Sequence, residues 1–207
     1  MKHIVFGIGI FCIAAVASAD TAFNNFGPSM AYNTLHGDRV SGSGSSNGYI
    51  ETAMQFTSLV SGSLESITTG LVDLSTSGMG DSMTLNLYTD NGSNGFGALL
   101  YSDHYDPGLS MTSQLSSVMN SNALITLTAG QKYWVDMVAD TDTNIGWNYD
   151  YQNTANQLVY QWSTPGGTPR QGSTDVSLQV TTQSVPEPAS IAALGLGLIG
   201  LLKGKRF

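Results

Sequence analysis

The sequence contains one cysteine, Cys12, and this residue lies in an apolar stretch near the N-terminus, residues 4–16. After this stretch, Ala17-Ser18-Ala19 has the small-x-small pattern of a signal-peptidase site. We therefore predict a signal peptide over residues 1–19 and a mature, exported chain that begins at Asp20. The mature chain would have no cysteine, which excludes disulfides, thiolate metal ligands and a cysteine nucleophile.

Basic residues are also scarce, with 7 Lys and Arg against 15 Asp and Glu. Residues 20–184 keep three basic residues, Arg39, Lys132 and Arg170, and every acidic residue except Glu187. Their formal charge is therefore about −11. Such a surface repels phosphate backbones, so we exclude nucleic acid as a partner, whereas cations would be attracted.

A long apolar run occurs again only at the C-terminal end, over residues 189–202, where it is also free of charge. Helix over these residues would span about 21 Å of a roughly 30 Å hydrocarbon core, so flanking residues would have to complete the span. The run is apolar on all faces. This favours a short transmembrane helix over an amphipathic helix buried at the end of a globular domain.

The segments on either side of this run have distinct chemistry. Before it, Val185-Pro186-Glu187-Pro188 contains two prolines, which lack amide donors and separate the run from any earlier strand. After it, Lys203, Lys205 and Arg206 form a basic stop of the kind that stays on the cytoplasmic side of a membrane.

This three-part order over residues 185–207 resembles the PEP-CTERM sorting signal of Gram-negative bacteria. The resemblance implies an exosortase that processes the tail near Pro186-Glu187-Pro188, after signal peptidase has acted at the other end. It also implies transient association with the inner membrane, followed by release to the cell surface or the extracellular matrix. Proteins of this family accompany exopolysaccharide, which is the partner that the resemblance suggests.

Residues 20–184 show about nine short segments of strand character between turn signals, and no long amphipathic helix. Residues 82–89 alternate cleanly, and residues 63–74 favour a strand although their apolar spacing also fits a helix. Residues 111–119 are expected to form a short helix or variable loop, and residues 123–128 and 132–138 a hairpin. The pattern predicts one all-β domain, an antiparallel β-sandwich or jelly roll.

A second resemblance covers this domain. Its motifs are Phe23-Asn24-Asn25-Phe26, Ala53-Met54-Gln55-Phe56, the stretch from Leu127 to Trp134, and Gly146-Trp147. They are similar to choice-of-anchor ectodomains, β-rich modules joined to alternative bacterial surface anchors, with type R the most similar. The resemblance implies architecture and no catalytic residues.

Asp140, Asp142 and Asn144 place oxygen ligands at alternate positions of a turn, as Ca²⁺ requires. The segment departs from an EF-hand loop, because Ile145 and Tyr151 stand where Gly and Glu are needed. An ordinary turn rich in Asp and Asn is the favoured interpretation. Any calcium here would be structural, and we expect no other cofactor.

Aromatic residues crowd the last third of the chain, and Trp134, Trp147 and Tyr149 are the candidates for contact with glycan. Alternation puts Trp134 on one face, with Lys132 and Asp136, and Trp147 and Tyr149 on another, so one of these rows should be core.

The function predicted from these patterns is that of an exported, non-enzymatic surface or matrix protein associated with exopolysaccharide or biofilm. A carbohydrate-binding module is the first alternative. A secreted hydrolase is the second alternative. The sequence shows no convincing acid pair or triad, which disfavours it, and two distant carboxylates such as Glu51 and Glu65 are the residues left for that role.

Overall fold

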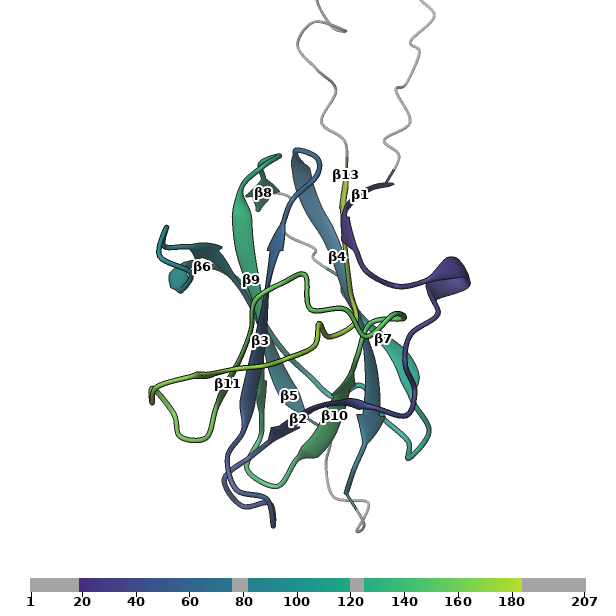
Figure 1. Cartoon of the computed structure of the whole chain (residues 1–207), viewed down its shortest axis with the longest axis vertical. Helices are drawn as coiled ribbons and strands as arrows, with labels where there is room; N and C mark the ends of the chain where they lie inside the picture. The colour runs from purple at the N-terminus through teal and green to yellow at the C-terminus, as the bar shows by residue number, and fades with distance from the viewer. Residues whose placement is uncertain (1–18, 76–81, 120–124, 184–207) are drawn as a thin grey trace, which may run out of the picture. The chain divides into compact units, whose positions relative to one another are not determined.

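The computed structural model describes residues 19–75, 82–119 and 125–183 (Figure 1). These residues belong to one unit, Ala19–Ser184. Residues 17 and 18 of the predicted cleavage site and the whole C-terminal segment 185–207 lie outside the described residues. The other two residues of that site, Ala19 and Asp20, form the start of the first strand.

Two antiparallel sheets make up this unit, and the all-β antiparallel fold predicted from the sequence is confirmed. Sheet A contains β1 (Ala19–Asn24), β2 (Gly37–Ser41), β4 (Gly62–Asp73), β7 (Gln114–Met119), β8 (Thr126–Leu127), β10 (Asn144–Asn148) and β13 (Leu178–Gln183). Sheet B contains β3 (Glu51–Thr57), β5 (Met83–Asp90), β6 (Phe96–Tyr105), β9 (Lys132–Ala139), β11 (Val159–Trp162) and β12 (Arg170–Gln171). A short 3₁₀ turn, η1 (Pro28–Met30), interrupts the segment between β1 and β2.

Strand pairing is nested, which identifies the fold as a jelly roll. Along the chain, β2 pairs with β10, β3 with β9, β4 with β7, and β5 with β6. The pairings of β10 with β4 and of β9 with β5 then join these pairs into the orders β2-β10-β4-β7 and β3-β9-β5-β6. This is the double-sheet arrangement of eight strands, to which β1, β13 and β8 add on one sheet and β11 and β12 on the other.

Alternating side chains on the strands build the core between the sheets. On β5, Met83, Leu85 and Leu87 are fully buried in it, while Thr84, Asn86 and Tyr88 lie on the opposite face, as the sequence predicts. Partners on the other strands include Met54, Phe56, Ile67, Leu71, Val135, Met137, Ile145, Trp147 and Leu178.

Two predictions about the region after β6 are wrong. Residues 114–119 form strand β7 rather than a helix or loop, and their pattern misleads because the apolar Leu115 and Met119 face solvent while Val118 is buried. The turn at Gly130 exists, but it does not close a hairpin, because β8 pairs with β4 whereas β9 pairs with β3 and β5. The strand interpretation of residues 63–74 is confirmed by β4.

Within the three described ranges, no helix has the length and apolar character needed to cross a membrane.

Replacing Leu85 with Ala should destabilise the domain by about 2–5 kcal/mol, because the side chain is fully buried and its removal leaves a cavity. Leu99→Ala on the neighbouring strand is the matched control, since Leu99 is 52% exposed, and it should change stability by about 0.5 kcal/mol or less. Chemical denaturation of both variants measures the difference. Equal effects would show that the inner face has been assigned incorrectly.

Candidate functional site

Five aromatic side chains gather on the face of sheet B that points away from the core, and we call them the aromatic cluster: Tyr88, Phe96, Trp134, Tyr160 and Trp162. Phe96 stacks on Tyr88 with ring centroids 4.6 Å apart, and Tyr160 stacks on Trp134 at 5.2 Å. Trp134 is fully buried beneath its neighbours, whereas the other four are half-buried. The cluster therefore offers aromatic surface to solvent above a rigid base.

Asp90 holds this cluster in place at the end of β5. Its Oδ2 accepts hydrogen bonds from Trp134 Nε1 at 2.9 Å and from Gln55 Nε2 at 2.7 Å, and its Oδ1 accepts one from the Gly92 amide at 2.7 Å. One carboxylate thus links β3, β9 and the turn before β6. Phe96, the first residue of β6, follows this turn and stacks on Tyr88.

Next to the aromatic cluster lie two acidic side chains, which we call the carboxyl pair: Glu51 at the start of β3 and Asp136 in the middle of β9. Asp136 is only 1% exposed, and its Oδ2 accepts a hydrogen bond from Asn86 Nδ2 at 3.0 Å. The other oxygen, Oδ1, is buried and has no hydrogen bond to a side-chain amide, hydroxyl or basic group of the described residues. Glu51 lies within hydrogen-bonding reach of Asp136 and accepts a hydrogen bond from the Tyr49 hydroxyl.

Burial and the nearby charge of Glu51 raise the pKa of Asp136 well above its usual value. No basic side chain balances the negative charge of the carboxyl pair. Within the described part of the chain, the ion pair that forms joins His104 to Asp140, and Arg39, Lys132 and Arg170 form no ion pair there. A hydrogen bond between two carboxyl groups requires a proton, and the raised pKa of Asp136 favours its retention on that carboxyl.

Two tyrosines surround the carboxyl pair and stay neutral. Burial and the hydrogen bond to Glu51 raise the pKa of Tyr49, and burial together with the charges of Asp136 and Glu51 raises the pKa of Tyr88. Their hydroxyls therefore remain donors over the physiological pH range.

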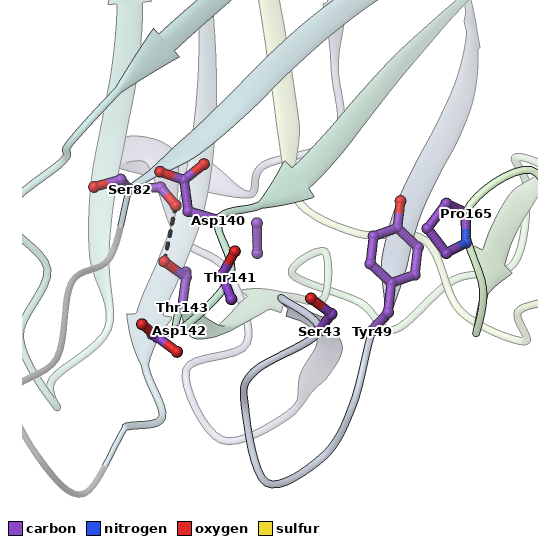
Figure 2. A pocket seen from close by; sticks show the side chains of 9 residues that line it. Ser43, Tyr49, Ser82, Asp140, Thr141, Asp142, Thr143 and Pro165 are labelled. Atoms are coloured by element: carbon purple, nitrogen blue, oxygen red, sulfur yellow. Dashed lines mark hydrogen bonds between the residues drawn. The ribbon is translucent and has the colours of Figure 1, made fainter.

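A cleft of about 630 Å³ is lined by Tyr49, whose hydroxyl donates a hydrogen bond to Glu51 of the carboxyl pair. Figure 2 shows Tyr49 and Pro165 on one side of this loop cleft and Asp140, Thr141 and Asp142 on the other. Its remaining lining residues are Ser43, Ser82, Ala139 and Thr143. None of the nine is basic, so the cleft is acidic, and its volume falls in the range of small-ligand sites.

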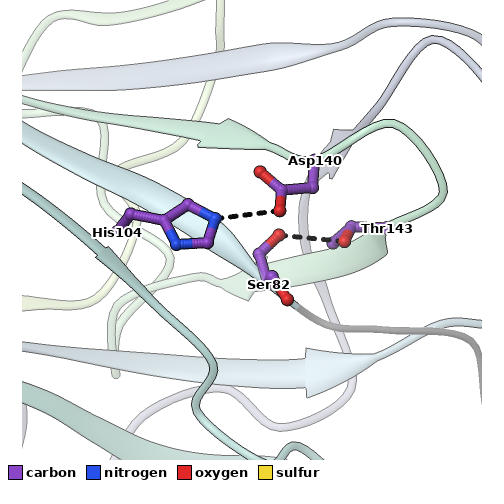
Figure 3. Close-up of polar contacts among 4 residues, drawn as sticks. All are labelled: Ser82, His104, Asp140 and Thr143. Atoms are coloured by element: carbon purple, nitrogen blue, oxygen red, sulfur yellow. Dashed lines mark hydrogen bonds and ion pairs between the residues drawn. The ribbon is translucent and has the colours of Figure 1, made fainter.

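Two of the three predicted calcium ligands, Asp140 and Asp142, line this cleft, whereas Asn144 does not. Asp140 Oδ2 is 2.9 Å from His104 Nε2 (Figure 3), and this contact raises the pKa of His104. Asn144 is nearly buried, and its amide donates to the Leu74 carbonyl at 3.2 Å, while Asp142 is exposed. Across the described residues, no group of three or more His, Cys, Asp or Glu is placed to hold a metal ion. Calcium at these residues stays a prediction.

The three predicted glycan-contact residues lie in different places. Trp134 is the buried base of the aromatic cluster, while Trp147 lies in the core, where its Nε1 donates to the Ser177 carbonyl at 2.8 Å. Tyr149 is half-buried and donates to Asp38 Oδ1 at 3.0 Å. The row of Trp147 is thus the one that forms core, and full burial keeps this side chain from any ligand at the surface.

Sequence reasoning missed the carboxyl pair. It named Glu51 with Glu65, but Glu65 lies on β4 of the other sheet, and the partner of Glu51 is Asp136. One available signal was the single carboxylate inside the otherwise apolar stretch from Tyr133 to Val138, because such a charge needs a partner. The pairing itself comes from the register that aligns β3 with β9.

Replacing Asp136 with Asn should stabilise the domain at neutral pH and flatten its pH dependence. An acid whose pKa is raised by folding binds more protons in the native state, so its contribution is favourable below about pH 4 and is lost as pH rises towards the folded-state pKa. Within that window, the free energy of unfolding falls by about 1.4 kcal/mol for each pH unit. Thermal melting of the two proteins from about pH 4 to pH 8 checks this. A constant difference between their melting temperatures would rule out the raised pKa.

The sorting residues Val185, Pro186, Glu187 and Pro188 and the basic residues Lys203, Lys205 and Arg206 lie outside the described residues. At the level of sequence, residues 184–206 match the PEP-CTERM protein-sorting motif, as predicted. A comparison of the whole sequence with curated proteins gave no match. The chain therefore carries the sorting signal of an exported protein that is processed by an exosortase, which implies the cell envelope or surface of a Gram-negative bacterium.

Proposed function

We propose that this is a non-enzymatic protein of the cell surface or extracellular matrix, and that its jelly-roll domain serves an exopolysaccharide or biofilm matrix. The sorting motif at residues 184–206 carries the proposal, because it directs an exported cargo to the cell envelope. In this proposal the cargo is the strongly acidic domain of residues 20–184, and its association with the inner membrane is transient. A signal peptide over residues 1–19 provides the export step.

The geometry of the carboxyl pair supports a binding role over hydrolysis. The two carboxyls of a glycosidase stand about 5–9.5 Å apart, so that the sugar or a water fits between them. Glu51 and Asp136 lie within hydrogen-bonding reach of each other, and Asp136 is 1% exposed. Such a pair has no room for a substrate between its members.

Carbohydrate binding is the activity that we propose for the domain, and the aromatic cluster supports it. Tyr160 and Trp162 on β11 and Phe96 on β6 are half-exposed on one face of the sheet. Flat aromatic rings that are apolar and rigid suit the apolar faces of sugar rings. Trp134 anchors this face from below instead of touching the ligand.

We further propose that residues 20–184 are a choice-of-anchor ectodomain of a type similar to R. The motifs behind this resemblance occupy structural positions: Phe23 and Phe56 are core residues, and Tyr133 and Trp134 belong to β9. Their roles are in packing, which agrees with a family defined by its architecture.

Changing Pro186 and Glu187 to Ala should block processing of the C-terminus, because the motif recognised by the exosortase is lost. In an exosortase-bearing host, the variant should stay in the membrane fraction with an intact C-terminal mass, while the unchanged protein reaches the surface or medium in shortened form. Pro107→Ala, a proline outside the motif, is the control. Identical masses and fractions for the variant and the unchanged protein would contradict sorting through this motif.

Trp162→Ala should weaken binding to the matrix polysaccharide about tenfold, because it removes an exposed aromatic face. Tyr151→Ala provides the control, since Tyr151 is 51% exposed but lies after β10, outside the aromatic cluster. Pull-down with polysaccharide from the producing cells measures binding, and circular dichroism confirms the fold of both variants. Equal binding by both variants would rule out the aromatic cluster as the glycan site.

A further inference from the structure

The carboxyl pair lacks a counter-charge, and this points to a ligand. Asp136 is 1% exposed, and no basic side chain of the described residues contacts its Oδ1, while the carboxyl shares a hydrogen bond with Glu51, another acid. Arg39 donates to Asn47, and Lys132 is close to Asn94, so neither of these cations serves the pair. A cation supplied from outside would complete this site.

The loop cleft provides the route to the pair. Tyr49 lines the cleft and donates a hydrogen bond to Glu51, so the side chain of Tyr49 separates Glu51 from the cleft. Asp140 and Asp142 on the opposite wall add negative charge, and only His104 contacts them as an ion pair in the described part of the chain. A cation entering the cleft therefore meets the carboxylates of Asp140 and Asp142 on one wall and Tyr49, which is hydrogen-bonded to Glu51, on the other.

Aromatic faces next to the pair select the kind of cation. Trp162 lies opposite Glu51 in the β3–β11 register, and Tyr160 lies opposite Ala53, which itself pairs with Asp136. Tyr88 on β5 is close enough to feel the charges of both carboxyls. Carboxylate and aromatic rings together are the usual recognition chemistry of an organic ammonium group, whereas a hard metal ion requires more oxygen ligands.

We propose that Glu51, supported by Asp136 and Tyr49, binds a protonated amine of the glycan, so that the ligand class is a polysaccharide that contains free amino sugars. This inference rests on the proposed carbohydrate binding and specifies its ligand. The amine enters the loop cleft and donates hydrogen bonds to Glu51, while the sugar ring lies against Trp162 and Tyr160.

Proton exchange accompanies this binding. The titratable groups that face the pair are Tyr49 before β3, Tyr88 on β5 and Tyr160 on β11; Asp140 lies on the opposite wall of the cleft, and His104 contacts Asp140. The pKa values of Tyr49 and Tyr88 are raised, so these hydroxyls keep their protons, and the proton between the two carboxyls is the one that an incoming ammonium group displaces. Binding of the amine should therefore release a proton to solvent.

The test compares oligomers of glucosamine with matched oligomers of N-acetylglucosamine, using the full-length protein and titration calorimetry. At about pH 5.5, where the amine is protonated, the glucosamine oligomer should bind about tenfold more tightly. Repeating the titration in two buffers of different ionisation enthalpy should show release of up to about one proton per site. Glu51→Gln should abolish both the preference and the proton release.

Glu65→Gln is the matched control, because it makes the same change on β4 of the other sheet and should leave both readouts unchanged. Asp142→Asn is a second variant in case Glu51→Gln fails to fold, because Asp142 lies on an exposed loop. It should weaken binding of the glucosamine oligomer and leave binding of the N-acetylglucosamine oligomer unchanged.

Three results would overturn the inference, and they separate it from the proposed function. If both oligomers bind equally and Trp162→Ala weakens both, carbohydrate binding stands and amine recognition fails. If neither oligomer nor the cell polysaccharide binds, both fail together. If a lysine peptide binds as tightly as the glucosamine oligomer, with the same dependence on Glu51, the ligand is a protein and not a glycan.

Discussion

Burial of sheet B on both of its faces is the constraint on which the site depends. Strand β9 contributes Val135 and Met137 to the core between the sheets, and Trp134 and Asp136 to the opposite face. The second burial is possible because Phe96 at the start of β6 and Tyr160 and Trp162 on β11 lie over that face, while Asp90 accepts a hydrogen bond from Trp134 beneath them. A carboxyl that alternation alone would leave in solvent is thereby enclosed.

Burial of Asp136 beside Glu51 is what raises the pKa of Asp136. An isolated surface carboxyl would be ionised and screened by solvent, whereas Asp136 loses its hydration and faces another acid. The domain tolerates this arrangement without a basic partner, which costs stability at neutral pH. Natural proteins retain such costs mainly at functional sites, and the acidic cleft next to Tyr49 fits that interpretation.

The C-terminal sorting signal and the jelly-roll domain have separate roles: the signal directs where the protein goes, and the domain carries the proposed binding activity. The signal at residues 184–206 is a short linear motif, so it can be recognised from consecutive residues alone. The proposed activity, in contrast, uses residues from β3, β5, β9 and β11 and from the loops that line the cleft, and these residues span more than a hundred positions in sequence.

By itself, the sequence determined the sorting motif, the all-β class and the inner face of β5, because these depend on local order or on a two-residue period. It misjudged residues 114–119 and the partner of β8, since exposed apolar side chains and a well-formed turn say nothing of which strand lies alongside. Only the tertiary structure paired Glu51 with Asp136 and put Trp147 in the core, because strand register across a sheet joins residues that no local pattern connects.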